Sequence, residues 1–386
     1  MMIQSILDND QYKFTMQQAI LKLGFAATPV KYKFKCRTPN IDFTRAYHLI
    51  LYNLAQLPHL RLGNNELQYM KSLPYFSDEY LEFLKQFRFD MGYVNLKVID
   101  NGELDLTIEG PWFHTILFET PMLAIVSNSY AEVMAPNDSR GEAIERLENK
   151  TTDLPLDFKF AELGTRRRRD FLFHRYVVER CKTKCPRNFL GTSNMLLSMI
   201  CDVKAVGTMA HEWLQAHQQL GYRLIDSQKM AFENWIKVYR GNLGIALSDV
   251  INTDAFLKDF DDPFLYKLFD GVREDSEPEP LQFAKRMIDF YYKRNIKPTL
   301  KTIVFSNGLD MKKALNIFYT TYGFIGSSYG IGTNLTNDWE TPPLNIVIKM
   351  VECNHQPVAK ISNSPSKNMC ENDDFVKYLK HVYEVE

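Results

Sequence analysis

The sequence predicts an α/β protein in which a mixed α+β N-terminal domain accompanies an irregular α/β barrel. From about residue 156 onward, short apolar runs that end in small or polar residues alternate with segments of helical periodicity, as in parallel βα units. Before that point, an alternating strand and a hairpin indicate a sheet with one face in water. The predicted domains are 1–155, completed by 340–386, and the barrel over 156–339.

The N-terminal region is expected to contain a helix, a strand and a hairpin. Residues 8–23 gather apolar side chains on one helical face, and Asp8 or Asp10 can cap that helix. In 30–37, apolar and basic residues alternate strictly, which is typical of a half-buried strand. An Asn-Gly pair within 94–108 predicts the turn of a hairpin.

Seven apolar runs are expected to form the strands of the barrel. In order, they are LDFKFAE, RNFL, VKAV, LGIAL, YKLFDGV, KTIVF and GFIGSSYGIG. The carboxyl ends of parallel strands meet at one face, so the small and polar residues after each run should converge where such barrels carry active sites. Their uneven spacing predicts an irregular barrel. The tail is expected to form a hairpin around CNHQ and a helix at 373–383.

Composition argues against several classes of partner. The net charge of -1 creates no overall electrostatic field that would attract nucleic acid or a membrane surface. The sequence contains no run of about 18 apolar residues, the length needed to span a bilayer. The first residues do not resemble a secretory signal. Of six cysteines only Cys181 and Cys185 lie close together, and no CxxC occurs, which favours reduced thiols in a cytoplasm over disulfides or a zinc site.

Four consecutive arginines, 166–169, follow Gly164 and Thr165 at the end of the first expected barrel strand. The run is compatible with a solvated face or a nucleic-acid contact. Alternatively, one or two guanidinium groups point into the barrel mouth and bind phosphate or carboxylate bidentately. The neutral net charge and the absence of further basic clusters weaken the nucleic-acid interpretation.

Two glycine-containing turns and two carboxylates occupy other strand ends. SNGLD (306–310) and GIGTN (330–334) offer backbone N–H groups that can cradle a phosphate, although each is also compatible with a plain turn. Asp249 and Asp275 could bind ribose hydroxyls or a magnesium ion, or simply cap helices at the surface.

His211 stands where an apolar run gives way to an expected helix, in VGTMAHEW. Zinc binding is excluded by spacing, because HEWLQAH is not HExxH. A satisfied core histidine is the usual interpretation. However, a neutral imidazole at the active-site face of a barrel could act as a base or as a nucleophile toward a phosphoryl group.

The sequence resembles the bacterial nicotinate phosphoribosyltransferase family. The resemblance rests on motifs in a fixed order over some 350 residues: DNDQYKFTMQQA, ELGTRRR, GTSN, GTMAHEW, SDVINTD, DGVREDS, FSNGLD, YGIGTNLTND and LNIVIKMVECN. It implies a type II phosphoribosyltransferase fold. It also implies an enzyme that converts nicotinate and phosphoribosyl pyrophosphate into nicotinate mononucleotide and diphosphate, coupled to ATP hydrolysis, in NAD salvage.

The resemblance also implies roles for single residues. His211 matches the histidine that takes the γ-phosphoryl group of ATP. Tyr12 matches an aromatic that stacks on the pyridine ring in the neighbouring subunit's site, so a homodimer with shared sites is expected. Leu163 stands where the second aromatic is usual, and Arg166 would face a carboxylate or phosphate. Ser193 replaces the aspartate of a nicotinamide-using relative, which favours an anionic substrate.

The strand ends would hold the ribose and phosphate groups of phosphoribosyl pyrophosphate. The residues expected there are Thr165, Asp249, Arg273, Asp275, Ser306, Asn307, Gly308, Gly330, Gly332 and Thr333. Mg²⁺, brought with ATP and diphosphate, could be held by Asp249 and Asp275. REDSEPEP and SNSPSK (362–367) depart from the family's usual DSGDP and SDSPGK. The alternatives are an enzyme for nicotinamide or quinolinate, or a non-catalytic barrel that binds a phosphate ligand.

Overall fold

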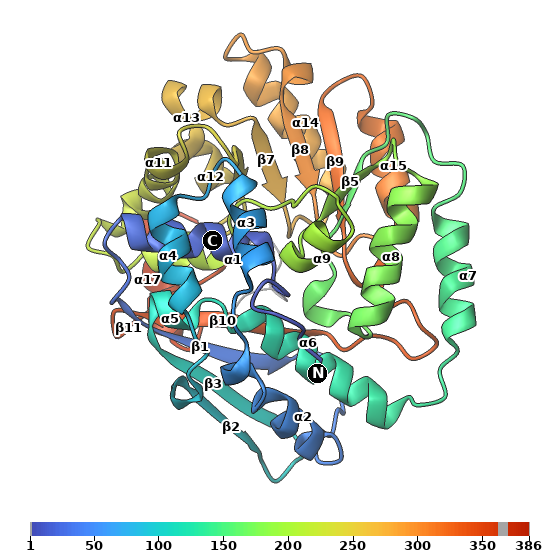
Figure 1. Ribbon diagram of the computed structural model, residues 1–386. Helices are drawn as coiled ribbons and strands as arrows, with labels where there is room; N and C mark the ends of the chain where they lie inside the picture. Colours follow the sequence, from blue (N-terminus) through green and yellow to red (C-terminus); the bar gives the residue numbers. More distant parts are fainter. Residues whose placement is uncertain (1, 362–369, 386) are drawn as a thin grey trace. The chain divides into compact units, whose positions relative to one another are not determined.

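The computed structural model describes residues 2–361 and 370–385, so SNSPSK (362–367) lies outside the described residues. The chain forms two compact units (Figure 1). The first contains Met1–Gly207 and Ile331–Lys349, and the second contains Thr208–Gly330 and Met350–Glu386. These units group residues by packing, and the expected domain bounds stay a prediction.

The first unit combines antiparallel strands, a parallel strand pair and most of the N-terminal helices. In chain order its elements are α1 (Gln11–Lys22), β1 (Pro29–Cys36), α2 (Tyr47–Leu54), η1 (Leu57–His59), α3 (Asn64–Ser72), α4 (Asp78–Gln86), η2 (Met91–Tyr93), β2 (Val94–Val98), β3 (Leu104–Pro111), α5 (Trp112–Thr115), α6 (Glu119–Met134), α7 (Arg140–Lys150), β4 (Phe160–Glu162), η3 (Thr165–Arg167), α8 (Phe171–Lys184), β5 (Phe189–Thr192), α9 (Met195–Ile200), α16 (Thr333–Thr336) and the start of β10 (Ile346–Cys353).

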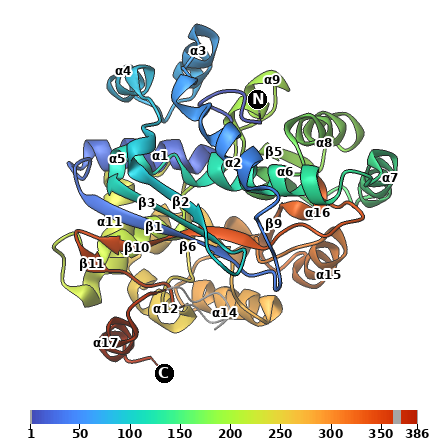
Figure 2. The ribbon, with the colours of Figure 1, turned by 90° about the horizontal axis from the view of Figure 1, so that it is seen from below.

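Strands β1, β2 and β3 form antiparallel pairs with one buried face. Tyr32 of β1 lies opposite Ile108 of β3, and Leu106 of β3 lies opposite Leu96 of β2. Tyr32, Leu106 and Ile108 are buried, because side chains on alternate positions of a strand share one face. Helices α1, α5 and α6 lie on one side of these strands in both views (Figures 1 and 2).

The second unit is built from parallel βα units. Its elements are α10 (His211–His217), η4 (Leu224–Asp226), α11 (Ser227–Tyr239), β6 (Ile245–Leu247), α12 (Thr253–Phe260), α13 (Pro263–Leu268), β7 (Gly271–Glu274), α14 (Pro280–Tyr292), η5 (Pro298–Leu300), β8 (Thr302–Phe305), α15 (Met311–Thr321), β9 (Gly326–Ile331, whose last residue belongs to the first unit), β11 (Gln356–Pro357) and α17 (Asp373–Tyr383). Ile245, Gly271, Thr302 and Gly326 lie in register across β6 to β9. The ends of these strands therefore reach the same edge.

The α/β fold class is confirmed, since parallel and antiparallel strands are both present. The strand expected at 30–37, the hairpin at 94–108 and the helix at 373–383 are confirmed as well. The hairpin around CNHQ forms between β10 and β11, and Asn354 and His355 in its turn have positive φ. The described helices include none that is long and apolar enough to cross a membrane.

Two of the expected barrel strands are wrong. The start of YKLFDGV is the end of α13, because Asp262 caps a helix that has Pro263 at its first position, and the strand begins only at Gly271. VKAV makes a single parallel bridge, between Ala205 and Thr192. The segment approaches β5 so closely that a Cβ on Gly191, whose φ is +135°, would lie 2.0 Å from the carbonyl oxygen of Lys204.

Candidate active site

His211 lies in a cluster of charged side chains in the second unit. It is the first residue of α10, and its Nε2 is 3.0 Å from Oδ1 of Asp249, just beyond β6. Lys360 donates from Nζ to the other carboxylate oxygen of Asp249 at 2.7 Å and to its backbone carbonyl at 2.8 Å. Asp275 lies 3.9 Å from His211 Nε2. We call His211, Asp249, Asp275 and Lys360 the histidine cluster.

Asp249 is held ionised inside the protein. Its burial alone would raise the pKa, but the positive charge of Lys360, the charge of His211 and the hydrogen bonds from both hold the pKa of Asp249 well below its usual range. An ionised carboxylate can only accept hydrogen bonds, so His211 must donate from Nε2. In a neutral imidazole, Nδ1 is then the nitrogen that carries the lone pair.

Other expected phosphate-binding residues lie at neighbouring strand ends of the second unit. Arg273 of β7 donates from Nε to Ser306 Oγ at 2.8 Å and contacts Asp275 at 3.0 Å. Asn307 donates to the carbonyl of Glu277. Gly308 has a φ of +55°, a backbone conformation that residues other than glycine rarely adopt. Gly330 lies near the end of β9.

The residues expected to bind the pyridine meet in the first unit. Asp10 lies at their centre: Tyr12 donates to its Oδ2 at 3.0 Å and Ser193 donates to its Oδ1 at 2.7 Å. Arg166 Nε lies 3.8 Å from the same carboxylate, and its NH1 is 3.2 Å from Glu119 Oε1. We call Asp10, Tyr12, Glu119, Arg166 and Ser193 the tyrosine cluster.

Burial and charge tune the two ionisable groups beside Asp10. Burial, together with the neighbouring carboxylates Asp10 and Glu119, raises the pKa of Tyr12 well above its usual value despite the opposing charge of Arg166. Burial would raise the pKa of Glu119 too, but the positive charges of Lys13, Arg166 and Lys349 bring it to about 2. Tyr12 is therefore a neutral hydrogen-bond donor and Glu119 an anion at neutral pH.

The arginine run is not a solvated face. Arg168 is buried and donates two hydrogen bonds to the carboxylate of Asp8, of 2.6 and 2.7 Å. Arg169 contacts Asp138 at 2.9 Å, and Arg167 donates to the side chain of Asn345. Each arginine thus has a partner within the first unit, which argues against the nucleic-acid interpretation.

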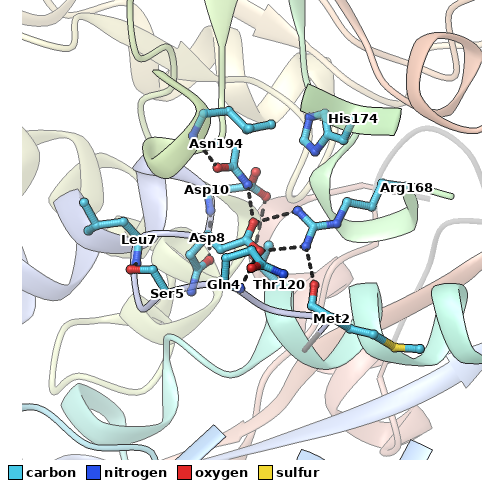
Figure 3. A network of polar contacts seen from close by, with 12 residues as sticks. Met2, Gln4, Ser5, Leu7, Asp8, Asp10, Thr120, Arg168, His174 and Asn194 are labelled. Carbon is cyan, nitrogen blue, oxygen red and sulfur yellow. Dashed lines mark hydrogen bonds and ion pairs between the residues drawn. The ribbon is translucent and has the colours of Figure 1, made fainter. Parts of the chain in front are cut away.

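Asp8 connects the N-terminal segment to two strand-end turns (Figure 3). Besides the two bonds from Arg168, it accepts one from Asn194 Nδ2 at 2.8 Å. Arg168 also donates to the carbonyl of Met2. Burial opposes ionisation of Asp8, but Arg168 and Asn194 lower its pKa below the usual value. Helix α1 begins at Gln11 with Asp10 at the N-cap position, but the Asp10 side chain makes no capping hydrogen bond and instead accepts one from Tyr12.

The remaining expected residues also lie in the first unit. Leu163 follows β4 and donates its N–H to the carbonyl of Ile331 at 2.9 Å. Thr165 is buried, and its hydroxyl has no hydrogen-bond partner among the described residues. Gly332 precedes α16, and Thr333 is the first residue of that helix.

The expectation that Tyr12 belongs to a neighbouring subunit's pyridine site stays a prediction, beside the contacts that Tyr12 makes within its own chain. Tyr12 is linked through Asp10 to Arg166 and Ser193 of its own chain. The backbone N–H of Gln11, next to it, also bonds the carbonyl of Ser193 at 2.7 Å. One chain therefore supplies all these residues.

The expected contribution of Asp249 and Asp275 to a magnesium site stays a prediction. Each of the two carboxylate oxygens of Asp249 is engaged by a nitrogen donor, one from His211 and one from Lys360. Within the described residues there is also no group of three or more His, Cys, Asp or Glu side chains able to hold a metal ion. Protein sites for Mg²⁺ often supply only one or two carboxylates and leave the other positions to phosphates and water.

Sequence reasoning missed the residues that hold the two clusters together. Asp10 was expected only as a helix cap, and Lys13, Glu119 and Lys360 were not singled out. One signal was present for Lys13: α1 carries polar side chains on all sides, yet Gln11–Ile20 are buried, so its polar groups require internal partners. Lys360 stands alone in an apolar stretch, PVAKI, which is a weaker signal.

Comparisons with known proteins agree with the resemblance. The nicotinate phosphoribosyltransferase (NAPRTase) family model matches residues 158–386, and the model of its N-terminal domain matches 7–127. A nicotinate phosphoribosyltransferase of Ectopseudomonas mendocina is 44% identical over 99% of this chain and 97% of its own length. The crystal structure of the Vibrio cholerae enzyme of that name superposes with a TM-score of 0.95, at 35% identity, over 100% of this chain and 95% of that one. The crystal structure of nicotinate phosphoribosyltransferase from Porphyromonas gingivalis superposes with a TM-score of 0.93, at 31% identity, over 99% of this chain and 100% of that one.

Proposed function

Because the chain belongs to the nicotinate phosphoribosyltransferase family, we propose that it joins nicotinate to phosphoribosyl pyrophosphate, forming nicotinate mononucleotide and diphosphate in NAD salvage. We further propose that ATP hydrolysis is coupled to this transfer through a phosphohistidine at His211. The contact between His211 Nε2 and Asp249, at 3.0 Å, is the observation that most supports the phosphohistidine. A histidine oriented by a buried carboxylate is a common form of activated nucleophile.

The hydrogen bond to Asp249 identifies the nitrogen that would be phosphorylated. Nε2 donates to the carboxylate, so Nδ1 attacks the γ-phosphoryl group of ATP, and ADP leaves. Asp249 then stabilises the positive charge that develops on the ring. Hydrolysis of the phosphohistidine later releases phosphate and restores the neutral imidazole.

The transfer step itself would rest on electrostatic stabilisation. The pyridine nitrogen attacks C1 of the ribose as diphosphate leaves, and it carries no proton at neutral pH, so no strong base is required. Arg273, together with the turns at Ser306–Gly308, lies where a departing polyanion could be bound. Mg²⁺ would supply further charge neutralisation to the phosphates when bound, and Asp249 and Asp275 are the carboxylates that could contribute to it.

The tyrosine cluster supports an anionic pyridine as substrate. Position 193 carries a serine in place of the carboxylate that would bind an amide, and its hydroxyl donates to Asp10. Arg166 keeps a third of its side chain exposed, while Lys13 and Lys349 help to neutralise Glu119. Nicotinate should therefore be used far better than nicotinamide, since an unmatched buried charge is costly.

Diphosphate release from phosphoribosyl pyrophosphate, measured with nicotinate, nicotinamide and quinolinate in turn, tests this function. Nicotinate should give the highest kcat/KM, by orders of magnitude. Arg166→Lys should weaken nicotinate use, because the planar guanidinium fork is lost. Equal kcat/KM for nicotinate and nicotinamide would contradict the assignment, and activity only with quinolinate would select the alternative enzyme.

We also propose a homodimer in the cytoplasm. All six cysteines are free thiols, which supports a reducing compartment. Sedimentation at enzyme concentrations near those of the assay would test the dimer. In this dimer, Tyr12 of one subunit would stack on the pyridine in the neighbouring subunit's site, as the family resemblance implies.

A further inference from the structure

Glu162, the last residue of β4, is a fully buried carboxylate that none of the roles above uses. Its Oε2 accepts a hydrogen bond from Thr192 Oγ1 at 2.5 Å and lies 2.7 Å from His174 Nε2. Its Oε1 accepts the backbone N–H of Gly164. Burial disfavours its ionisation, but His174, Thr192 and Gly164 lower its pKa below the usual value, so Glu162 is an anion.

The partners of Glu162 lie on the two turns that carry pyridine-binding residues. Gly164 leads into η3, whose second residue is Arg166. Thr192 ends β5 and directly precedes Ser193, whose backbone N–H donates to the backbone carbonyl of Glu162 at 2.9 Å. The Glu162 residue thus touches both turns, through its side chain and through its main chain.

The space around this carboxylate leaves little room for movement. A Cβ on Gly164 would lie 2.1 Å from Thr336 Oγ1 and 2.9 Å from Glu162 Oε1. Thr336 Oγ1 donates to the Gly164 carbonyl at 3.2 Å. His174, on α8, closes the other side and is itself fully buried. The turn before Arg166 is therefore fixed from both sides.

We propose that Glu162 is a positioning residue that sets the separation of Arg166 and Ser193 and thereby the affinity for the substrate's carboxylate. This inference rests on the proposed use of nicotinate. Glu162 itself would not touch the substrate. It would act by holding the N–H of Gly164 and the hydroxyl of Thr192 on one rigid, charged group, since charge-assisted hydrogen bonds are the stronger ones.

The proposed contacts of Arg166 and Ser193 with the substrate determine which kinetic constant should change when Glu162 is replaced. Arg166 and Ser193 would contact the pyridine's carboxylate equally in the ground state and in the transition state, so a misplaced pair raises KM rather than lowering kcat. The ribose and phosphate groups would be bound mainly by other residues. A general loosening of the fold would instead impair both substrates.

Steady-state kinetics of Glu162→Gln test the proposal. We expect the KM for nicotinate to rise about ten- to hundredfold, the loss typical of one hydrogen bond to a charged group. The KM for phosphoribosyl pyrophosphate should change by less than about twofold. Glu179→Gln is the matched control, because Glu179 lies on the exposed face of α8 and forms a surface ion pair with Arg175 at 2.8 Å.

Thr192 provides a second test that does not change the buried charge. Thr192→Val removes the hydroxyl and should raise the KM for nicotinate about tenfold, whereas Thr192→Ser keeps it and should behave like the wild type. If Glu162→Gln does not fold, the comparison of Thr192→Val with Thr192→Ser tests the proposal. An unchanged nicotinate KM in folded Glu162→Gln, equal rises for both substrates, or equal behaviour of the two Thr192 variants would overturn the proposal. A wild-type enzyme that does not use nicotinate would refute the proposed function instead.

Discussion

Asp249→Asn tests whether the buried carboxylate activates His211. In the wild type, Asp249 accepts a hydrogen bond from His211 Nε2 at 3.0 Å and one from Lys360 Nζ at 2.7 Å. Asparagine has nearly the same shape but no negative charge. It can accept only through its carbonyl oxygen, so it cannot serve both donors as the carboxylate does.

The expected loss follows from the kind of bond that is removed. A hydrogen bond to an ionised partner contributes about 1.5–3 kcal/mol. About 1.4 kcal/mol corresponds to a factor of ten in rate, so phosphorylation of His211 should slow about ten- to hundredfold. Stability should fall as well, because Lys360 is left buried without its counter-ion, a change that costs about 3–5 kcal/mol.

Single-turnover labelling with γ-labelled ATP measures the first effect, and thermal unfolding measures the second. The double variant Asp249→Asn with Lys360→Met separates them, because it removes both buried charges and should regain stability while still phosphorylating slowly. The label on the wild type should be acid-labile and base-stable, on Nδ1, and absent from His211→Ala. Labelling of Asp249→Asn at the wild-type rate, or recovery of the rate together with stability in the double variant, would refute the reasoning.

Three further predictions concern other parts of the chain. Burial raises the pKa of Asp259 from the ordinary value of 3.8 to about 6. The protonated carboxyl therefore stabilises the fold fully below pH 3.8, and this stabilisation is lost as the pH rises through about 6. Asp259→Asn removes the titrating group, so the Tm of the variant relative to the wild type should rise between about pH 4 and 7. Gly164→Ala forces a Cβ against Thr336 and should cost about 1–3 kcal/mol in unfolding measurements, whereas no loss would mean that the turn can yield. In the proposed dimer with shared sites, mixing Tyr12→Ala chains with His211→Ala chains should restore some sites, because each defect can fall in a different site; a lack of complementation after proven subunit exchange would contradict the sharing.

The features that the sequence predicted correctly are those set by local pattern. The helix at 373–383 has a capping asparagine and strong amphipathic spacing, and the hairpin at 94–108 has its Asn-Gly pair between alternating strands. The strand-end position of Asp249 followed from the alternation of strands and helices. Such signals lie within a few residues of the element they specify.

The partners of the site residues could not be predicted in the same way. Lys360 lies 111 positions beyond Asp249, and Ser193 lies 183 positions beyond Asp10. No local periodicity connects such pairs, because they meet only after both segments have packed. The contact between Tyr12 and Asp10 is different, because the two residues are only two positions apart, yet Arg166, which lies 3.8 Å from Asp10, comes from a distant segment.

The four consecutive arginines differ in burial and in their partners, although they lie in one turn after a strand. Arg168 is buried against Asp8 and Arg169 against Asp138, and both bonds attach the turn to distant segments. Arg166 keeps a third of its side chain exposed, and it lies 3.2 Å from Glu119 and 3.8 Å from Asp10. A guanidinium that is anchored yet accessible can meet a substrate's carboxylate without first paying the entropy of ordering its own side chain. In the proposed function, the two buried arginines would therefore act through Arg166, by keeping rigid the turn that carries it.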